Sequence, residues 1–490
     1  MRKPPLWLLP AADLLAVGLI PLNLYVLAFP EWIVWAAVVV LAALHVLLWR
    51  GKRPGIGGKL ALSILGILAA GVCLLGSCCN PYWSSISFRE DAARTVRDDS
   101  LTLTGREAAR ELDWAMHYLK KLHPAALHGL PAQTQERYRA ARTALAAADM
   151  VDITELTRQT ESVLSTLGDA HTYAGAKYNA PHTLRFLAVE QAAGRTITAV
   201  NGETLEALLA RNTDRFSYEM ESLGIARLRQ MLRTKEGLAY LGIPADGAVY
   251  TFSDEAGSHA EYVCRDADFV PPAEFDRLSG VQSAGETAFV RYELDPARDL
   301  AVLTLDECRW NDTYRDTLQS FFAEVQAAGI GNVAVDLRRN GGGNSLVGDA
   351  FISYLNTYSY RSWGMRWRLG PFVLSRAGDK VKNDRQKDLL FRGNVYVLTS
   401  AQTFSAAMDF AMLIHDNGLG TLIGEPPGNL PDSYGDVAFF SLPRSGIFMQ
   451  ISTKQWTRID ETLAGTPIEP EVPCPAADAM KALYRELERN

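Results

Sequence analysis

From about Thr287 onward, short apolar runs alternate with segments of helical periodicity. The runs LAVLTLDEC, NVAVDL, NVYVLTS and GTLIGE are predicted strands, and DTYRDTLQSFFAEVQAAG, GDAFISYLN and the segment after Ser405 are predicted helices. This alternation favours a mostly parallel α/β sheet, because parallel strands need a crossover connection, usually a helix. Sites in such sheets form beyond the carboxyl ends of the strands. The stretches DLRRNGGGN and TSAQTFSAA lie at such ends.

The chain has 490 residues, too many for one ordinary domain. Composition and periodicity predict six segments, which are a three-span membrane anchor (1–80), a polar linker (81–100), a helical cap domain (101–180), a small α+β module (181–275), the α/β core (276–480) and the end of a C-terminal helix (481–490). Within the module, the Asn201-Gly202 pair predicts a tight turn, because both residues tolerate positive φ.

Three apolar runs fill the N-terminal segment, at Leu6 to Ala28, Trp32 to Trp49 and Leu60 to Leu75. Each approaches the roughly 20 residues that a helix needs to cross hydrocarbon. Lys and Arg precede the first run and follow the second, and such residues favour the cytoplasmic side. We therefore expect a multi-pass protein of the cell membrane, with the N-terminus in the cytoplasm and the catalytic domain outside. LLGSCC resembles a lipidation signal around Cys78, but it lies far from the N-terminus.

The formal net charge is −7, which excludes the basic footprint of a nucleic-acid-binding protein. The six cysteines show no C-x-x-C spacing and no accompanying histidine pattern, so neither a metal nor a cofactor is expected. An oxidising compartment would allow one disulfide among Cys264, Cys308 and Cys474, and the sequence does not select the pair. The sequence also leaves the oligomeric state open.

Two short motifs are candidates for chemistry. One glycine would satisfy a turn, but the three glycines at 341–343 offer bare backbone N–H groups, as an oxyanion site requires. A phosphate loop is disfavoured because no Gly-Lys-Ser/Thr follows. Ser405 opens a helix after a strand and a turn, with Ala406 and Ala407 leaving space beside it. Such a serine fits either a helix cap or a nucleophile.

In order, NVAVDLRRNGGGN, VLTSAQTFSAAMDFAMLIHDNG, TLIGEPPG and GTPIEPEV resemble the core of the C-terminal-processing (tail-specific) serine peptidases, and STLGDAHTYAG resembles the D-x-H-T element of their tricorn-like branch. The resemblance covers roughly residues 100–475. It implies a crotonase/ClpP-like α/β core with a helical cap. It also implies Ser405 as nucleophile and His171 as general base. The implied oxyanion hole consists of the backbone N–H groups of Gly342, Gly343 and Ala406.

The chain departs from the family pattern at several positions. One branch uses a lysine base, but no lysine occurs between Ser405 and Lys454, so a Ser–Lys dyad is disfavoured. Ala170 stands where the tricorn-like branch has a second serine. That branch also uses a glutamate near the final motif, for which Glu461 is the nearest candidate although its register is off. The third catalytic residue is therefore left open.

These observations predict a membrane-anchored serine endopeptidase that cleaves peptide or protein substrates on the extracytoplasmic side. A histidine base with an ordinary pKa would make activity fall on the acid side at a pH of about 6–7. The alternative is a non-catalytic extracytoplasmic binding protein on the same fold, because a fold does not fix a function.

Overall fold

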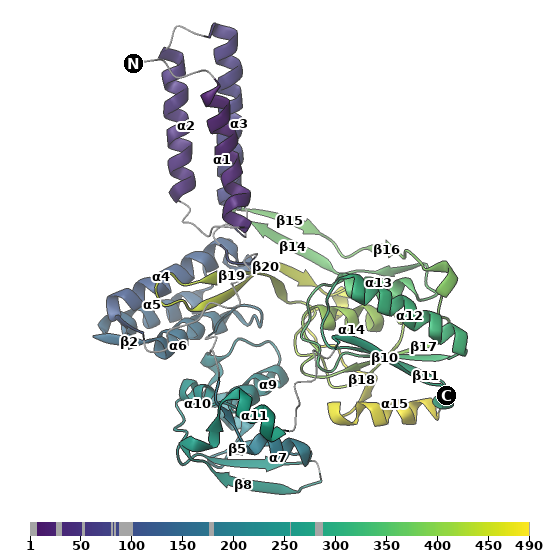
Figure 1. Ribbon diagram of the computed structural model, residues 1–490. Helices are drawn as coiled ribbons and strands as arrows, with labels where there is room; N and C mark the ends of the chain where they lie inside the picture. The colour runs from purple at the N-terminus through teal and green to yellow at the C-terminus, as the bar shows by residue number, and fades with distance from the viewer. Residues whose placement is uncertain are drawn as a thin grey trace.

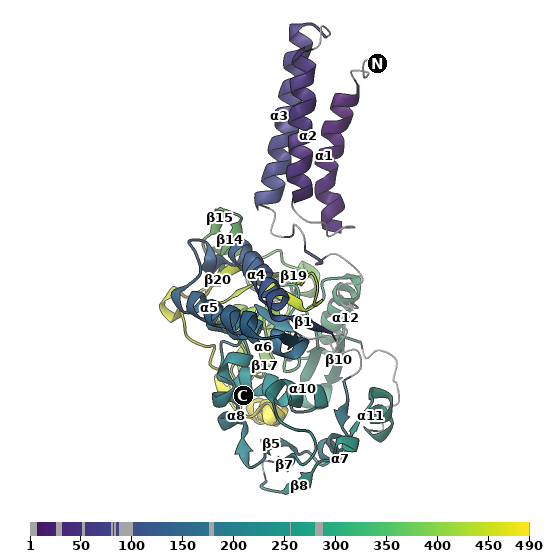
Figure 2. The same cartoon turned by 90° about the vertical axis from the view of Figure 1, so that its left-hand side faces the viewer.

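The computed structural model describes residues 7–25, 32–50, 54–79, 82, 85–87, 101–175, 181–254, 256–279 and 288–489. The predicted linker, residues 81–100, lies almost wholly outside these described residues, as does the side chain of Cys78. Figures 1 and 2 show an N-terminal group of helices standing apart from a larger body of cap, module and core.

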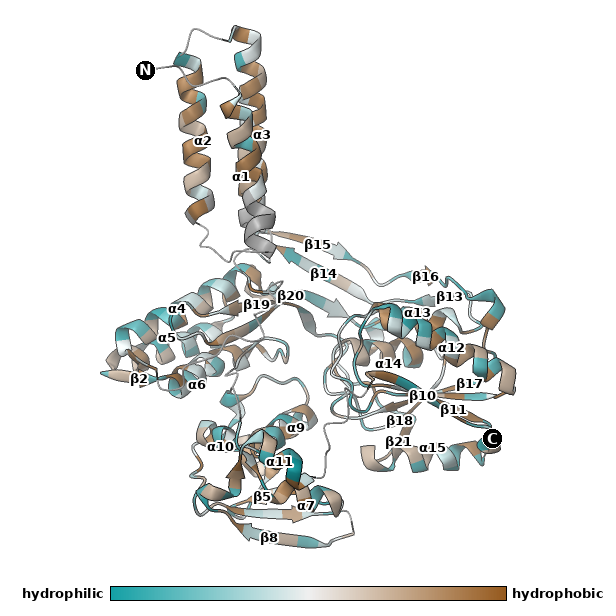
Figure 3. Ribbon diagram, in the orientation of Figure 1, coloured by the Kyte–Doolittle hydropathy of each residue, from teal (hydrophilic) through white to brown (hydrophobic). Residues whose placement is uncertain are grey.

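The three N-terminal apolar runs form the helices α1 (Leu8–Tyr25), α2 (Trp32–Arg50) and α3 (Ile56–Cys79), which lie side by side in both views. Figure 3 shows mostly hydrophobic residues in the coloured parts of these helices. Among the described residues, only one segment, the 21 residues Ile56–Gly76 of α3, is long and apolar enough to cross a membrane. The helices are as predicted, and three membrane crossings are not established.

The helical cap packs α4 (Gly105–Leu122), α5 (Ala132–Ala147) and α6 (Ile153–Leu164) together, with a two-stranded sheet of β1 (Thr102–Thr104) and β2 (Met150–Asp152) beside them. Thr104 begins α4 with a capping box. Its side chain accepts the N–H of Glu107, whose carboxylate accepts the N–H of Thr104 in return. A short 3₁₀ turn, η3 (Ser165–Leu167), follows α6 and ends at Gly168 with φ 59°. This turn ends three residues before His171, the predicted base.

The small module contains a four-stranded sheet in the order β6 (Glu203–Thr204), β5 (Thr196–Val200), β7 (Val249–Ser253) and β8 (His259–Val263). Asn201 and Gly202 have φ values of 54° and 77°, so the tight turn is confirmed. The module's other elements are α7 (Phe186–Ala192), α8 (Leu205–Arg211), α9 (Glu221–Met231), α10 (Lys235–Leu241), α11 (Pro272–Ser279) and the paired strands β4 (Thr183–Leu184) and β9 (Phe269–Val270).

The predicted α/β sheet has six strands in the order β10 (Val290–Asp295), β11 (Leu300–Leu305), β12 (Asn332–Asp336), β17 (Asn394–Thr399), β18 (Thr421–Gly424) and β21 (Val472–Pro473). Only the pairing of β10 with β11 is antiparallel. The helices α12 (Asp312–Ala328), α13 (Leu346–Ser353) and α14 (Ala406–Asp416) cover one face, and α15 (Ala479–Leu487) covers the other (Figure 1).

Alternation along the strands explains why both faces are covered. Val333 and Val335 of β12 pack with α12, α13 and α14, whereas the intervening Ala334 packs with α15. Successive side chains of a strand point to opposite faces, so a continuous apolar run needs a layer on each side. The mostly parallel α/β sheet is therefore confirmed.

A second sheet joins the core to the cap. Its strands run in the order β15 (Phe372–Arg376), β14 (Gly364–Leu369), β20 (Phe448–Thr457) and β19 (Tyr434–Ser441), and β3 (Tyr173–Gly175) also pairs with β20. The separate pair β13 (Ser359–Arg361) and β16 (Lys380–Lys382) lies beside it. Phe440 and Met449 of this sheet share one hydrophobic core with the cap helices. The cap is thereby packed against the second sheet through one shared apolar core.

Cys264, Cys308 and Cys474 are free thiols in the structure. Burial raises the pKa of the Cys308 thiol to about 12, so this group packs as a small apolar side chain. The disulfide that the sequence allowed does not form among these three residues.

Candidate active site

Ser405 lies at the sharp corner between β17 and α14. Its φ and ψ are 57° and −125°, a backbone conformation that residues other than glycine rarely adopt. The Ser405 N–H donates a hydrogen bond of 2.8 Å to the side-chain oxygen of Asn429. The Ser405 side chain makes no capping hydrogen bond to α14. The helix-cap interpretation of this serine is therefore wrong, and its hydroxyl is left for another partner.

The glycine-rich turn packs directly against this corner. Gly342 and Gly343 have φ values of 100° and 137°. A Cβ on Gly342 would lie 2.6 Å from Ser405 Cβ, and one on Gly343 would lie 2.3 Å from the carbonyl oxygen of Cys308. Cys308 also holds the turn in place, because its N–H donates to Gly342 O and its carbonyl accepts the N–H of Asn344. Glycine is required at both positions by conformation and by space.

One of the three predicted oxyanion donors is already occupied. The Gly342 N–H donates to the side-chain oxygen of Asn340 at 2.9 Å, so Gly342 shapes the turn and does not offer its own N–H. Among the described residues, no acceptor contacts the N–H of Gly343 or that of Ala406, the first residue of α14. These two N–H groups are the open donors beside Ser405.

His171 is brought to the same corner by the cap. It follows η3 and precedes β3, and β3 pairs with β20 so that Tyr173 lies opposite Gln450. The His171 ring is 6% exposed and stacks on Phe404, the residue before Ser405, with ring centroids 4.4 Å apart. Both ring nitrogens are buried without a hydrogen-bond partner among the described residues. The serine and the histidine are thus neighbours, but their side chains are not hydrogen-bonded in this structure.

Asp169 anchors the histidine turn. One carboxylate oxygen accepts the His171 N–H at 2.8 Å and lies 3.8 Å from His171 Nδ1. The other oxygen accepts from His123 Nε2 at 3.0 Å and from Ser452 Oγ at 2.7 Å. Burial raises the pKa of Asp169, but the hydrogen bond and charge of His123, together with His171, outweigh burial and hold this pKa well below its ordinary value. Asp169 is therefore an anion at neutral pH.

A second carboxylate, Glu219 of the small module, also reaches His171. Ligating atoms of Asp169, His171 and Glu219 all lie within 4.8 Å of one another, close enough to consider a metal ion. However, each of these carboxylate oxygens already accepts a hydrogen bond: three from backbone N–H groups, one from His123 and one from Ser452 of β20. The cluster is consequently organised around the imidazole, with no open set of ligands.

The structure does not bring Glu461 to this cluster. Glu461 lies in the exposed 3₁₀ turn η8 (Glu461–Leu463), and no described contact joins it to His171. Lys454 is also engaged elsewhere, 2.6 Å from Asp436 Oδ2 and over the rings of Trp367 and Trp456. No described hydrogen bond or ion pair links Lys454 to Ser405.

Several of these contacts had no usable signal in the sequence. Glu219 stands in a loop far from every motif, and Asn429 directly follows TLIGEPPG in a loop, so only packing brings them near His171 and Ser405. His123 ends α4 and is fully buried against Asp169. Asp169 was visible only as the acid two residues before the histidine.

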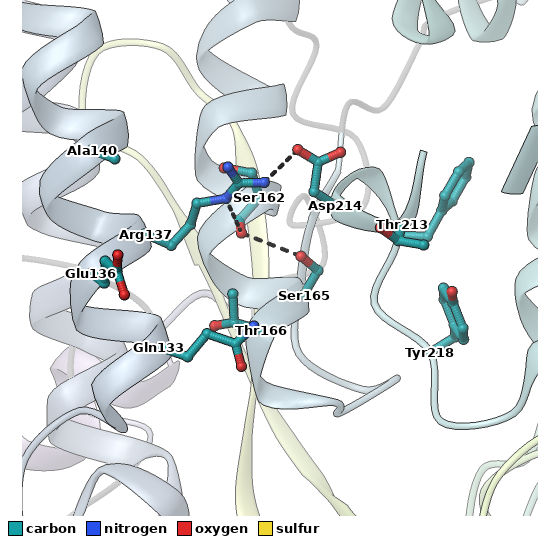
Figure 4. A pocket seen from close by; sticks show the side chains of 11 residues that line it. Gln133, Glu136, Arg137, Ala140, Ser162, Ser165, Thr166, Thr213, Asp214 and Tyr218 are labelled. Carbon is teal, nitrogen blue, oxygen red and sulfur yellow. Dashed lines mark hydrogen bonds and ion pairs between the residues drawn. The ribbon is translucent and has the colours of Figure 1, made fainter. Parts of the chain in front are cut away.

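Two cavities lie in this region. One, of about 630 Å³, reaches the candidate site and is lined by Gly341, Gln402, Phe404, Tyr173, Arg227 and mostly apolar neighbours. The other, of about 540 Å³, lies between cap and module and is shown in Figure 4. Arg137 there pairs with Asp214 and donates to the carbonyl of Ser162. No histidine lines the second cavity, whereas Phe404, the residue before Ser405, lines the first.

Residues 299–474 match the model of peptidase family S41. Among solved structures, mature CPAF complexed with lactacystin is 13% identical, with a TM-score of 0.51, and the match covers 79% of this chain and 97% of that one. Mature CPAF alone is 12% identical, with a TM-score of 0.51, and the match covers 78% of this chain and 96% of that one. The photosystem II D1 C-terminal processing protease is 14% identical, with a TM-score of 0.43, and the match covers 78% of this chain and 97% of that one. No curated protein sequence matches this chain.

Identities this low establish the fold, and the CPAF matches extend the shared α/β architecture over cap, module and core. The family match adds the chemistry, since it spans the glycine turn, the serine corner and the final strand that the sequence motifs had singled out. A non-catalytic binding protein is not favoured by this match. Residues 299–474 thus match peptidase family S41, and this match supports a serine peptidase that hydrolyses peptide bonds.

Proposed function

We propose that Ser405 attacks the carbonyl carbon of a peptide bond and that His171 takes its proton. The observation that carries this proposal is the uncapped Ser405 hydroxyl on a strained corner, pressed against a glycine turn. Strain of this kind is concentrated at functional sites. The N–H groups of Gly343 and Ala406 would stabilise the oxyanion of the tetrahedral intermediate.

The state of His171 supports its role as base. Neither ring nitrogen makes a hydrogen bond to another described residue, so the ring is open to the serine hydroxyl. The ring is held only by stacking on Phe404 and by the turn around Asp169. Serine–base contacts commonly tighten only when substrate binds, so the absence of this hydrogen bond in the free enzyme does not argue against the pair.

We propose that the substrate enters the cavity of about 630 Å³ beside the serine corner. Its size is within the range of ordinary ligand sites. Phe404, Tyr173 and other apolar side chains would receive apolar substrate residues. The buried guanidinium of Arg227 would face polar atoms of the peptide at one end.

We further propose that the N-terminal helices anchor the enzyme, with the catalytic body outside the cytoplasm. The apolar segment Ile56–Gly76 supports one crossing, and the apolar helices α1 and α2 beside it support a three-span arrangement. His45 Nε2 of α2 lies 3.6 Å from Asp13 Oδ2 of α1, a polar contact that would hold two such helices together in lipid.

Ser405→Ala and His171→Ala should each reduce kcat by about 10⁴-fold or more, as for other serine peptidases. The matched controls, Ser222→Ala and His182→Ala, change exposed residues and should retain wild-type rates. Cleavage of a quenched fluorescent peptide library and labelling by a serine-reactive phosphonate would measure this. A Ser405→Ala enzyme that cleaves or is labelled like wild type would refute the assignment.

Gly342→Ala should reduce kcat on the order of 10²-fold, because the added Cβ displaces Ser405 and a shift of about 1 Å costs that much. The adjacent Gly341→Ala has nothing within 4 Å of its added Cβ, so its melting temperature should match wild type. Equal turnover in folded Gly342→Ala and wild-type enzyme would remove this turn from the site.

The pH profile of kcat/KM should hold its plateau through pH 6 and fall toward pH 4. Burial lowers the pKa of His171 from 6.5 to about 4, with Asp169 opposing the shift and Arg227 adding to it. A base acts in its neutral form, which is lost as the pH falls through that pKa. Half-maximal activity at pH 6–7 would contradict the buried histidine as base.

Circular dichroism at each pH is the control for that profile. The unfolded imidazole takes up its proton near pH 6.5 and the folded one near pH 4. The unfolded state therefore binds more protons between these values, so His171 makes the protein less stable as the pH falls through this window. A loss of kcat/KM is attributed to titration of His171 only at pH values where circular dichroism shows that the protein is still folded.

Reporter fusions test the proposed topology. A reporter after residue 55 should behave as cytoplasmic and one after residue 100 as external, because Lys and Arg concentrate before α1 and between α2 and α3. The reverse pair of results would overturn the proposed orientation, and an external reporter at both positions would rule out three crossings.

A further inference from the structure

The small module contributes a carboxylate that joins two loops of the site. Glu219 precedes α9, and one of its oxygens accepts the N–H of Ala170 at 3.3 Å. The other oxygen accepts the N–H of Leu430 at 2.9 Å. A single side chain from the module therefore bridges the histidine turn of the cap and the core loop that connects β18 to β19.

Each of these loops holds one of the two proposed reacting side chains. Ala170 immediately precedes His171. Asn429, beside Leu430, accepts the N–H of Ser405 at 2.8 Å and donates to the carbonyl of Leu430 at 3.1 Å. The distance between base and nucleophile is consequently set in part by the two hydrogen bonds of Glu219.

Arg227 of α9 holds the same turn from a second side. One guanidinium nitrogen donates to the carbonyl of Ala170 at 2.9 Å, and another donates to the carbonyl of Ser217. The guanidinium also lies over the Phe404 ring, 5.7 Å from its centroid, and Phe404 stacks on His171. Ala170 thus has both its N–H and its carbonyl fixed by side chains of the module.

The charges around His171 agree with this arrangement. Asp169 is held ionised, and burial together with the Asp169 charge raises the pKa of Glu219 to about 8. Arg227 and Tyr434 are the other titratable groups that face Glu219, alongside His171 itself. Two carboxyl groups therefore lie beside the ring that must become an imidazolium when Ser405 loses its proton.

Resting on the proposed function, we infer that Glu219 is the positioning residue of this enzyme, a carboxylate from the small module that sets His171 against Ser405. It takes the role for which the sequence suggested Glu461, but it comes from a different domain. The module is then a component of the active site, and the cap and core alone would leave the base unaligned.

The test compares Glu219→Gln with the matched control Glu221→Gln, an exposed carboxylate at the start of α9, in the full chain. Glutamine keeps the size of the side chain but presents an N–H₂ group where one loop offers an N–H donor, so one bridge is lost. We expect kcat to fall between about 10- and 100-fold with KM nearly unchanged, because the base moves while the cavity does not. Glu221→Gln should match wild type in both.

A double-mutant cycle separates positioning from stability. In the His171→Ala background, Glu219→Gln should cause no further loss in cleavage or in phosphonate labelling of Ser405, because its effect passes through the histidine. Additive losses would show a structural role only and overturn the inference. If Glu219→Gln melts well below wild type, Glu219→Asp, which keeps the carboxyl group but is too short to span both loops, should show the same kcat loss.

The outcomes distinguish this inference from the proposed function. Wild-type kcat in Glu219→Gln, with Ser405→Ala and His171→Ala inactive, refutes the positioning role and leaves the mechanism standing. Wild-type activity in His171→Ala refutes the mechanism itself, and the inference with it.

Discussion

The buried carboxylate of Asp169 is the interaction on which the site depends. It is fully buried, and it accepts hydrogen bonds from His123 at the end of α4, from Ser452 on β20 and from the His171 backbone. An ion in this environment is tolerated only while its partners are present, because its lost hydration must be replaced. Those partners come from cap and core, so the charge is satisfied only when the cap packs on the second sheet. Placement of the histidine is thus a consequence of domain packing.

The serine side of the site depends on a steric constraint. Ser405 keeps a positive φ because the buried helix α14 begins at Ala406, the strand β17 is fixed in the sheet, and Asn429 holds the N–H between them. Gly342 lies so close that no side chain fits between the two segments. Phe410 and Met412 of α14 are in the main core, so the fold can hold a strained corner that a loop could not. The strained backbone of Ser405 and the glycine at position 342 therefore depend on each other, because they pack directly together.

Three parts of the chain meet at this corner, and each contributes a different kind of group. The cap supplies the proposed base, the core supplies the proposed nucleophile and the open N–H donors, and the module supplies Glu219 and Arg227. The cavity beside Ser405 is lined from all three. A peptidase built in this way needs all three parts docked before its reacting groups are aligned, which separates folding of each part from assembly of the site.

The sequence by itself determined what local patterns encode. Strand–helix alternation predicted the parallel sheet, the Asn201-Gly202 pair predicted the turn, and ordered motifs indicated the family and pointed to Ser405, His171 and the glycine turn. Only the tertiary structure decided which N–H groups remain open and which acid faces the imidazole. Asn340 occupies the N–H of Gly342, Glu461 is exposed, and Glu219 arrives from another domain. The physical reason is that hydrogen-bond partners and buried charges are set by contacts between residues distant in sequence, for which periodicity and short motifs carry no signal.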